Sequence, residues 1–400
     1  MTVAPRRIVV VGASAAGLTA VETLRAEAFD GEITLVGAER RAPYDRPPLS
    51  KQVLSGTWAP SRTELRPEAS YEELDLSMRL GRSAVGLDVR DRTVTLDDAS
   101  RLEYDALLIA TGVRPREIPA MAGSPGVHVL RTLDDALAFR AAALTADPVL
   151  VVGAGFLGTE VAATLTVLGR QVTMVDAERA PMRRQLGRVV AERLHRLHTE
   201  RGVDVRTETA LRHCLPRDGG GVDAVLTDGT VVRTGCILIA IGATPATQWL
   251  GHSGLRIDDG VVCDPRCQAA PGVHAAGDVA SWTHRGSGAR LRVEHRTNAT
   301  EQAITAARNM LGADEPYLPV PYFWSDQFGV KIQVYGSVTA ATEFAVIHGD
   351  PNEDTFVALY GSGGRVVGAL GWRAPRELLR ARSLVAGQVP WQEVCVAERT

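Results

Sequence analysis

Lysine is nearly absent from this 400-residue chain, because all but two of its 44 basic residues are arginines. The two lysines are Lys51 and Lys331, and such a rare lysine suggests a place where a compact ammonium group is needed. Long apolar runs are missing too. The longest, such as Cys236–Ile241, have the length of a strand and fall short of the roughly 18 residues of a membrane span. The sequence predicts a soluble, cytoplasmic protein with no membrane partner.

Cysteine is also scarce, and the net charge is small. The five cysteines follow no disulfide pattern: they are Cys214, Cys236, Cys263, Cys267 and Cys395. Cys263 and Cys267 lack two further ligands, so we expect no metal site. A net charge of −3 argues against nucleic acid as a bulk electrostatic partner. His195 and His198 lie three residues apart on an expected helix, and we expect them on its solvated face.

Two stretches of the same design stand 141 positions apart. Residues 7–17 and residues 149–158 each consist of an apolar run, a glycine-rich turn and the start of an expected helix. This arrangement lets backbone N–H groups at a helix N-terminus meet a pyrophosphate with no side chain in the way. Ser14 replaces the middle glycine of the first turn, and its small side chain still permits close approach. One such turn is a weak signal, but two complete units indicate two dinucleotides on one chain.

An acidic residue follows each turn. Glu39 comes 22 residues after Gly17, and Asp176 comes 18 residues after Gly158. Each lies just past a second apolar run, where a carboxylate accepts hydrogen bonds from an adenosine ribose. Two turns, each with its acid, are what an oxidoreductase that uses both a flavin and a nicotinamide requires.

A second repeat extends the first. Residues 94–112 predict a hairpin followed by a buried strand that ends in Thr-Gly, and residues 225–242 repeat this pattern with an offset of 130 positions. After Pro319 the composition becomes aromatic and β-rich, and a helix is expected at about residues 375–386. The predicted fold is α/β, with two doubly wound (Rossmann-like) domains and a small α+β C-terminal domain. The expected boundaries are 1–115 with 243–320, 116–242, and 321–400.

Several stretches outside the glycine turns carry a more specific signal. They are Pro-Tyr-Asp-Arg-Pro-Pro-Leu-Ser-Lys at 43–51, Leu-Ile-Ala-Thr-Gly at 108–112, Leu-Arg-Thr-Leu at 130–133, Ala-Ala-Gly-Asp-Val at 275–279, Val-Glu-His at 293–295 and Phe-Trp-Ser-Asp-Gln at 323–327. With them the chain resembles the oxygenase-coupled, NADH-dependent ferredoxin reductase family, from about Arg7 to Gly387. The resemblance implies a glutathione-reductase-like fold in which the discontinuous first domain binds FAD and the second binds NADH.

The resemblance also implies a set of FAD residues: Gly12, Ser14, Ala15, Ala16, Glu39, Arg46, Pro47, Lys51, Val85, Thr111, Arg131, Asp278, Glu294, His295, Arg296 and Trp324. Asp278 would bond the ribityl chain, and Trp324 would lie near the isoalloxazine ring. Taken alone, the Ala-Gly-Asp tripeptide is also typical of a helix N-cap, so that alternative stays open.

For NADH, the resemblance implies Gly153, Gly155, Phe156, Leu157, Gly158, Glu160, Asp176, Arg184 and Gly242. It also pairs Lys51 with Glu160 as catalytic residues. A cation near flavin N5 favours the anionic reduced ring, and a neighbouring carboxylate holds the ammonium in place. The alternative for Glu160 is a favourable charge near a helix start.

The choice of nicotinamide depends on the charges after the second turn. Asp176 and Glu178 would repel a 2′-phosphate, so we expect NADH rather than NADPH. Three nearby arginines weaken that expectation: Arg179, Arg183 and Arg184.

One residue departs from the family pattern. Arg296 stands where the family often has tryptophan, and together with Arg290 and Arg292 it could form a basic docking patch. The implied partner is a small acidic [2Fe–2S] ferredoxin that feeds a haem-thiolate monooxygenase or a Rieske dioxygenase. Arginines of the last helix, such as Arg380, could help to steer it. We expect a monomer or a weak dimer.

Two other functions stay open. Residues 46–51 contain no cysteine, which excludes the dithiol chemistry of disulfide reductases with related architecture. An NADH oxidase or a rubredoxin-type reductase could use the same scaffold. The third possibility is a redox-responsive NADH- and FAD-binding protein of the apoptosis-inducing-factor type.

Overall fold

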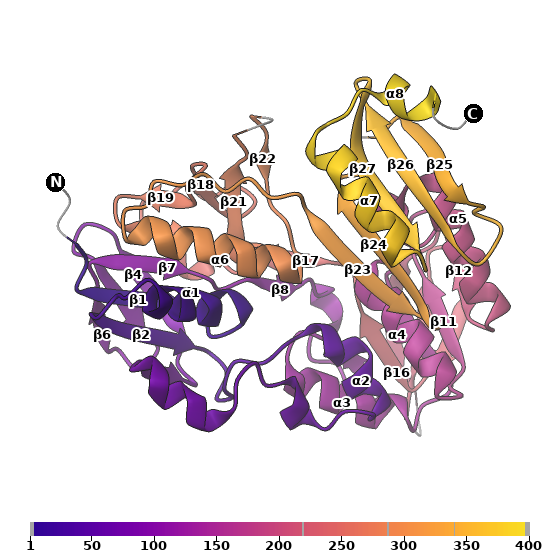
Figure 1. The fold of residues 1–400 in the computed structure, drawn as a ribbon. Coiled ribbons are helices and arrows are strands. Elements are labelled where there is room, and N and C mark those ends of the chain that lie inside the picture. The colour runs from indigo at the N-terminus through magenta and orange to yellow at the C-terminus, as the bar shows by residue number, and fades with distance from the viewer. Residues whose placement is uncertain (1–3, 218–219, 286–287, 340, 397–400) are drawn as a thin grey trace. The chain divides into compact units, whose positions relative to one another are not determined.

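The computed structural model describes residues 4–217, 220–285, 288–339 and 341–396 (Figure 1). The chain folds into two compact units. The first comprises residues 1–45, 61–114 and 243–319, and the second comprises residues 46–60, 115–242 and 320–400. No helix within the described ranges is both long and apolar enough to cross a bilayer.

The first unit is built on a six-stranded sheet in the order β19-β20-β7-β1-β2-β3. All neighbouring strands are parallel except β19 and β20. The strands are β1 (Arg7–Val11), β2 (Glu32–Gly37), β3 (Ser77–Leu80), β7 (Ala106–Ile109), β19 (Gln268–Ala270) and β20 (Val273–Ala275). Helices α1 (Ala15–Ala26) and α6 (Arg296–Met310) pack against each other. Every residue of β7 is buried, as expected for a central strand covered on both faces.

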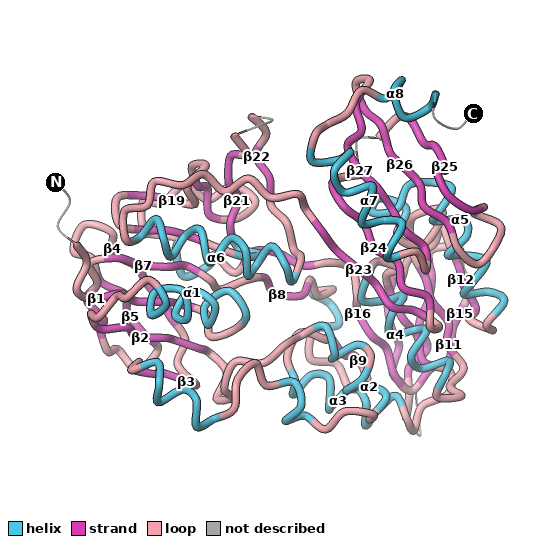
Figure 2. Tube along the Cα trace, in the orientation of Figure 1, coloured by secondary structure: helices cyan, strands magenta, loops and turns pink. Residues whose placement is uncertain are grey.

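Smaller elements complete this unit (Figure 2). One antiparallel sheet contains β4 (Ala84–Asp88), β5 (Thr93–Leu96) and β6 (Arg101–Glu103), another sheet contains β18 (Val261–Cys263), β21 (Ala280–Thr283) and β22 (Arg290–Leu291), and β8 (Val113–Pro115) pairs with β17 (Ala243–Pro245). Short 3-10 helices are η2 (Pro60–Thr63), η3 (Glu68–Leu74), η5 (Gln248–Leu250) and η6 (Gly277–Val279).

The second unit contains a five-stranded parallel sheet in the order β12-β11-β10-β16-β9. Its strands are β9 (Val127–His128), β10 (Val149–Val152), β11 (Val172–Val175), β12 (Asp204–Arg206) and β16 (Cys236–Ile239). An antiparallel sheet is formed by β13 (Leu211–Pro216), β14 (Val222–Leu226) and β15 (Val231–Thr234), and the helices are η4 (Pro119–Met121), α3 (Leu133–Ala143), α4 (Phe156–Val167) and α5 (Arg183–Glu200).

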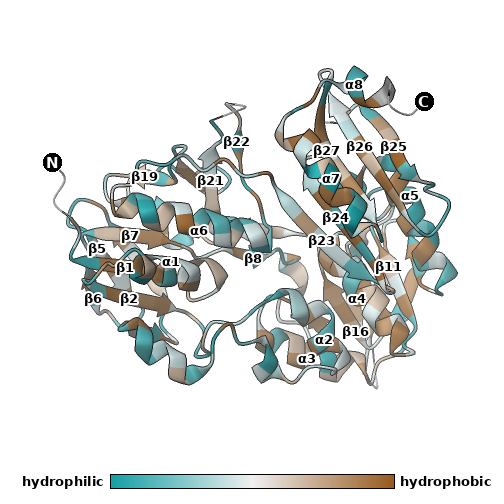
Figure 3. Ribbon diagram, in the orientation of Figure 1, coloured by the Kyte–Doolittle hydropathy of each residue, from teal (hydrophilic) through white to brown (hydrophobic). Residues whose placement is uncertain are grey.

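An antiparallel sheet from the end of the chain belongs to the same unit, in the order β23-β24-β27-β26-β25. Its strands are β23 (Tyr322–Gln327), β24 (Val330–Gly336), β25 (Glu343–Gly349), β26 (Phe356–Ser362) and β27 (Arg365–Trp372), followed by α7 (Pro375–Ala386) and α8 (Trp391–Val396). Helix α7 buries Leu378 and Ala381 against this sheet, and its visible side is hydrophilic in Figure 3. The loop at 46–60 also groups with this unit and forms η1 (Pro47–Ser50) and α2 (Gln52–Ser55).

The predicted fold class is confirmed. The repeated pattern can be followed strand by strand: β7 and β16 differ by 130 positions at both ends, and each is preceded by an antiparallel hairpin. The three domain boundaries drawn from the sequence stay a prediction. The chain separates into two compact units, and the second unit contains both residues 115–242 and residues 320–400.

Candidate functional site

The first glycine turn follows β1 and is packed too tightly for side chains. A Cβ on Gly12, at φ +126°, would lie 2.1 Å from the Ala110 carbonyl oxygen. A Cβ on Gly17 would lie 1.9 Å from the Gly12 carbonyl oxygen. The first hydrogen bond of α1 runs from the Leu18 N–H to the Ser14 carbonyl at 2.9 Å, so the N–H groups before it have no acceptor within the helix. This end of the helix therefore fits a pyrophosphate.

Eleven of the sixteen residues assigned to FAD lie in the first unit: Gly12, Ser14, Ala15, Ala16, Glu39, Val85, Thr111, Asp278, Glu294, His295 and Arg296. Glu39 lies two residues beyond β2 and accepts a hydrogen bond from the Tyr44 hydroxyl at 2.6 Å. The Thr111 hydroxyl donates to the Ala246 carbonyl at 2.9 Å. Asp278 is half-buried in η6, whereas Val85 is 53% exposed. Their roles toward FAD stay predictions.

Residues 294–296 form the start of α6. Glu294 is exposed, His295 is the N-cap residue and Arg296 is the first residue of the helix. Burial lowers the pKa of His295 to about 4, so this ring is neutral near pH 7. The Arg296 Nε donates to Asp45 Oδ1 at 2.5 Å. The residue that departs from the family pattern therefore anchors the end of the Tyr44–Asp45 segment within this unit.

The predicted basic patch contains carboxylates as well as arginines. Arg290 pairs with Asp258, and Arg292 pairs with both Asp259, at 3.1 Å, and Glu294, at 2.6 Å. Paired carboxylates cancel much of the positive field of the guanidinium groups. Steering of a ferredoxin by this surface stays a prediction, and the structure gives it less local charge than the arginine count suggested.

The remaining five FAD residues lie in the second unit: Arg46, Pro47, Lys51, Arg131 and Trp324. Arg46 is the N-cap residue of η1. The backbone N–H of Arg131 donates to Asp135 at 3.0 Å, just before α3. Trp324 lies in β23 and stacks on Tyr322 with 6.0 Å between ring centroids.

The second glycine turn, between β10 and α4, shows the same tight packing at two positions and an open one between them. A Cβ on Gly153 would lie 2.3 Å from the Ala240 carbonyl oxygen, and a Cβ on Gly158 would lie 1.8 Å from the Gly153 carbonyl oxygen. Gly155 has an ordinary φ of −78°, and a Cβ there would meet nothing within 4 Å. The fold itself does not require glycine at 155, but close approach of a nucleotide would.

The predicted acid lies beside this turn. Asp176 follows β11, and its carboxylate accepts hydrogen bonds from the Ala154 N–H at 2.5 Å and the Glu178 N–H at 2.7 Å. Phe156, Leu157 and Glu160 lie on α4, and Gly242 is exposed after β16 at φ +94°. Two of the three arginines near the turn are paired: Arg184 Nε donates to Glu178 at 2.9 Å, and Arg179 donates to Glu208 at 3.1 Å.

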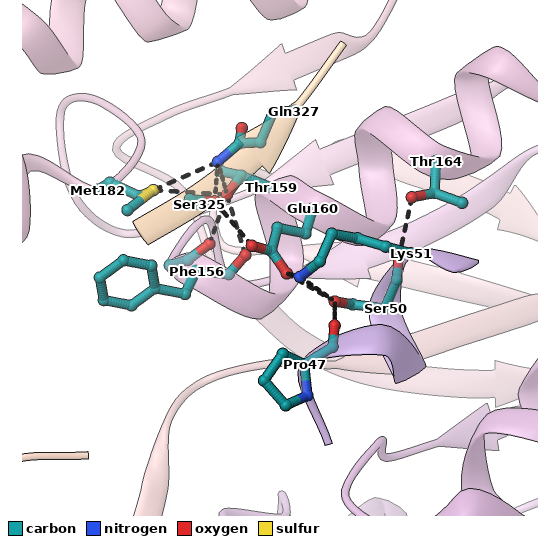
Figure 4. Close-up of polar contacts among 11 residues, drawn as sticks. Pro47, Ser50, Lys51, Phe156, Thr159, Glu160, Thr164, Met182, Ser325 and Gln327 are labelled. Carbon is teal, nitrogen blue, oxygen red and sulfur yellow. Dashed lines mark hydrogen bonds and ion pairs between the residues drawn. The ribbon is translucent and has the colours of Figure 1, made fainter. Parts of the chain in front are cut away.

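The two residues predicted to be catalytic form an ion pair in the second unit (Figure 4). Lys51 Nζ lies 2.6 Å from Glu160 Oε2, and the two side chains are only 13% and 9% exposed. Ser50 Oγ donates to the same carboxylate oxygen at 2.6 Å, while the Thr164 hydroxyl fixes the Ser50 carbonyl at 2.9 Å. Two segments that are 109 positions apart in the chain are joined by these bonds.

Further polar residues that the sequence did not single out surround Glu160. Ser325 Oγ donates to Glu160 Oε1 at 2.8 Å, and Gln327 Nε2 lies 2.9 Å from both Ser325 Oγ and Thr159 Oγ1. The signal was present: β23 buries every second residue, so Ser325 and Gln327 share the buried face with Phe323. Polar residues on that face need partners inside the protein.

The prediction for His198 is wrong. Its side chain is fully buried, and its Nε2 lies 2.8 Å from Gln327 Oε1. The helix that carries it packs this side against the C-terminal sheet rather than against water, with Leu194 and Val330 in one core. His195, three residues earlier, is half-buried.

The described cysteines are free thiols, and the side chain of Cys395 lies outside the described residues. Burial raises the pKa of Cys267 to about 12, which makes it an unreactive thiol. Among the residues that the structure describes, no three His, Cys, Asp or Glu side chains gather as a metal site.

The arrangement of two glycine turns, two acids and a lysine–glutamate pair can be compared with known proteins. Residues 6–303 match the model for pyridine nucleotide-disulphide oxidoreductases, and residues 322–400 match the model of a reductase C-terminal domain. The chain belongs to the pyridine nucleotide-disulphide oxidoreductase family. Within this family it is similar to ferredoxin–NAD(+) reductase components of dioxygenase systems, which confirms the resemblance described above.

Two relatives and two solved structures show the extent of the similarity. The chain is 34% identical to rhodocoxin reductase of Rhodococcus erythropolis (96% of this chain, 90% of that one). It is 37% identical to the ferredoxin–NAD(+) reductase component of the anthranilate 1,2-dioxygenase system of Burkholderia cepacia (96% and 95%). Putidaredoxin reductase in its covalent complex with putidaredoxin superposes with a TM-score of 0.91 at 28% identity over all of both chains. The ferredoxin reductase for the CYP199A2 system of Rhodopseudomonas palustris gives 0.93 at 28% identity over 97% of each.

Proposed function

We propose that this protein is an FAD-dependent NADH:ferredoxin reductase that supplies electrons to an oxygenase. The observation that carries the proposal is the presence of two complete dinucleotide units together with a buried Lys51–Glu160 pair in a chain without a dithiol at residues 46–51. Relatives that match over nearly the whole chain are ferredoxin–NAD(+) reductase components. When bound, FAD accepts two electrons from NADH and releases them singly to an iron–sulfur protein, which nicotinamide cannot do.

The residues of the first glycine turn fit the pyrophosphate of FAD. The turn presents backbone N–H groups and the small side chains of Ser14, Ala15 and Ala16 at the start of α1. Glu39 lies past β2, where it would bind the adenosine ribose. Asp278 is delivered by β20 to η6 and would bind the ribityl hydroxyls.

The second glycine turn fits the pyrophosphate of NADH. The space beside Gly155 is open, and the positive end of α4 is turned toward the same place. Asp176 would exchange its bond to the Ala154 N–H for one to the ribose, or accept both. Its carboxylate repels a 2′-phosphate.

NADH is favoured over NADPH by the pairing of two of the three nearby arginines, Arg179 and Arg184. Arg184 is engaged by Glu178 and Arg179 by Glu208, so neither guanidinium lacks a carboxylate partner. A 2′-phosphate would have to compete with these carboxylates for the arginines.

Lys51 would place its ammonium against the flavin. Glu160 Oε2 and Ser50 Oγ accept two of its three N–H donors, at 2.6 and 3.3 Å, which fixes the direction of the third. A fixed positive charge near the reduced ring stabilises its anionic form without reorganisation during the reaction. Glu160 thus acts on the chemistry through Lys51.

We propose a [2Fe–2S] ferredoxin as the acceptor, with either a haem-thiolate monooxygenase or a Rieske dioxygenase behind it, in the cytoplasm. The support is that similar proteins of both kinds are known: the ferredoxin reductase for the CYP199A2 system on one side, and the reductase components of dioxygenase systems on the other.

An anaerobic absorbance titration tests the proposal. The purified yellow protein should be bleached by one equivalent of NADH and far more slowly by NADPH. Addition of an oxidised [2Fe–2S] ferredoxin should then restore the oxidised flavin spectrum. A colourless protein, or a flavin that NADH does not reduce, would refute it. Fast reoxidation by oxygen but not by ferredoxin would indicate an NADH oxidase instead.

A further inference from the structure

The polar side chains around Glu160 form one connected chain of hydrogen bonds within the second unit. It runs from Lys51 to Glu160 and on through Ser325 and Gln327 to His198. The last three side chains are at most 2% exposed. Figure 4 shows the part from Lys51 to Gln327, with the β23 residues and the α4 residues directed toward one another.

The direction of each bond follows from the donors available. A carboxylate only accepts, so Ser325 must give its single hydroxyl proton to Glu160 Oε1. Its oxygen can then only accept from Gln327 Nε2. The second Nε2 hydrogen goes to Thr159 Oγ1, whose own proton is directed to the Gly155 carbonyl at 2.9 Å. Gln327 therefore presents its carbonyl oxygen to His198, and His198 must donate from Nε2.

The tautomer of His198 follows. A proton on Nε2 leaves Nδ1 without one, and this buried atom has no hydrogen-bond partner among the described residues. Burial lowers the pKa of His198 to about 4, so the ring is neutral in the physiological range. The chain of donors thus begins at a neutral histidine, and every bond along it is directed toward the Glu160 carboxylate.

We propose that Ser325, Gln327 and His198 are positioning residues that hold the Glu160 carboxylate, and through it the Lys51 ammonium, in one fixed arrangement. The inference rests on the proposed function, in which Lys51 acts on the flavin. Glu160 Oε2 accepts hydrogen bonds from Lys51 and Ser50, and Glu160 Oε1 accepts one from Ser325. The β23 side of the network therefore occupies one carboxylate oxygen and leaves the other for the lysine.

The same network fixes the second glycine turn. Gln327 Nε2 donates to Thr159 Oγ1, and the single Thr159 hydroxyl proton is directed to the Gly155 carbonyl at 2.9 Å, with the Phe156 carbonyl at 3.1 Å. The rings of Phe156 and Phe323 pack edge to face with 4.9 Å between centroids. Gln327 therefore holds the Lys51–Glu160 pair and the turn proposed for NADH relative to each other. Displacements of about 1 Å in such a pair can cost a factor of about 100 in rate.

The scarcity of lysine supplies a direct probe. Lys51 and Lys331 are the only lysines of the chain, so incorporation of lysine labelled with ¹⁵N at Nζ gives at most two side-chain ammonium signals. Lys331 is exposed and serves as the internal reference, and Lys331→Arg assigns the two signals. The measurement is made on the FAD-loaded full chain, with the rate of flavin reduction by NADH recorded in parallel.

Three variants remove successive links: Ser325→Ala, Gln327→Leu and His198→Met. We expect each to shift the Lys51 signal and to speed exchange of its ammonium protons about tenfold, because a charge-assisted contact is weakened. Flavin reduction should slow by about tenfold in each, with little change in KM for NADH in Ser325→Ala and His198→Met. His198→Gln keeps an N–H donor at the position of Nε2 and should restore both properties.

Tyr360→Phe is the matched control. The Tyr360 hydroxyl donates to the Leu186 carbonyl at 2.5 Å, so this variant loses a buried hydrogen bond to α5 outside the Glu160 network. It should lose stability but leave the Lys51 signal and the reduction rate unchanged. Ser325→Ala and Gln327→Leu with spectra and rates like those of Tyr360→Phe would overturn the positioning role.

The two readouts separate this inference from the proposed function. If NADH failed to reduce the flavin of the unsubstituted protein, the proposed function would be wrong. The Lys51 signal would still decide whether Ser325, Gln327 and His198 hold the pair.

Discussion

Replacing Glu160 with glutamine removes the carboxylate that faces the Lys51 ammonium and keeps a side chain of the same size. The pair is 2.6 Å apart and about nine-tenths buried. Breaking a buried ion pair on one side costs about 3–5 kcal/mol, since it leaves an uncompensated charge. Because Lys51 retains some exposure, we expect Glu160→Gln to lower the free energy of unfolding by about 3 kcal/mol. Lys51→Met should cost less, about 2 kcal/mol, because Ser50 and Ser325 still donate to Glu160.

The double variant Lys51→Met with Glu160→Gln leaves no buried charge at this place. It should lose about 2 kcal/mol of unfolding free energy, well below the sum of the losses of the two single variants. The difference is a coupling energy of about 3 kcal/mol. The assay is urea unfolding followed by circular dichroism at one saturating FAD concentration, since ligand binding itself adds to the apparent stability.

An exposed ion pair in the same unit is the control. Arg184 and Glu178 have side chains that are 75% and 39% exposed, and the cycle Arg184→Met with Glu178→Gln should give a coupling of roughly 0.5 kcal/mol or less. Additive losses for Lys51→Met and Glu160→Gln, or a coupling no larger than that of the control, would refute the view that the buried pair acts as one element.

Three further predictions follow from single positions. Gly155→Ala should raise KM for NADH at least about tenfold in steady-state kinetics and leave the flavin spectrum unchanged, because the added methyl meets the proposed nucleotide and no protein atom. Gly155 is the N-cap residue of α4, where alanine is less favourable, so we expect a small loss of Tm. An unchanged KM would place the nucleotide elsewhere. Glu178→Ala releases Arg184 and should raise kcat/KM for NADPH relative to NADH by about tenfold, roughly 1.4 kcal/mol. Glu208→Ala releases Arg179 in the same way and is measured beside it. Burial lowers the pKa of His274 from 6.5 to about 4, so between pH 6.5 and 4 the unfolded chain binds a proton there that the folded chain does not. The folded state therefore loses stability as the pH falls through that window. His274→Gln should flatten the pH dependence of the unfolding free energy by about 1.4 kcal/mol per pH unit relative to the unsubstituted chain, and parallel curves would contradict it.

The sequence allowed prediction of the elements whose periodicity and turn chemistry are local. The two strand–turn–helix units, the repeat at residues 94–112 and 225–242, and the helix at 375–386 all appear at the expected places. In each, a glycine turn, a short apolar run or a proline at the helix start acts on the backbone locally. Figure 1 shows the result for each unit.

What the sequence did not reveal depends on contacts between distant segments. His198 was assigned to a solvated face because helical spacing says which residues share a face but not what covers it. Its burial follows from the C-terminal sheet packing on α5, through contacts such as His198 with Gln327, 129 positions later. Ser325 and Gln327 were likewise recognised only as parts of a motif. Arg296 was expected to add charge to a docking surface, and the carboxylate of Asp45 that binds it lies 251 positions away.

The most direct test of the account is NADH-driven reduction of cytochrome c with and without an added [2Fe–2S] ferredoxin, under anaerobic conditions. Cytochrome c accepts single electrons, so it reports whether two-electron input from NADH leaves the protein one electron at a time through the ferredoxin. We predict a rate that is proportional to ferredoxin at low concentration, saturates at high concentration, and falls at least about tenfold in Lys51→Met. An NADH-dependent rate that is the same with and without ferredoxin, or unaffected by Lys51→Met, would contradict the account.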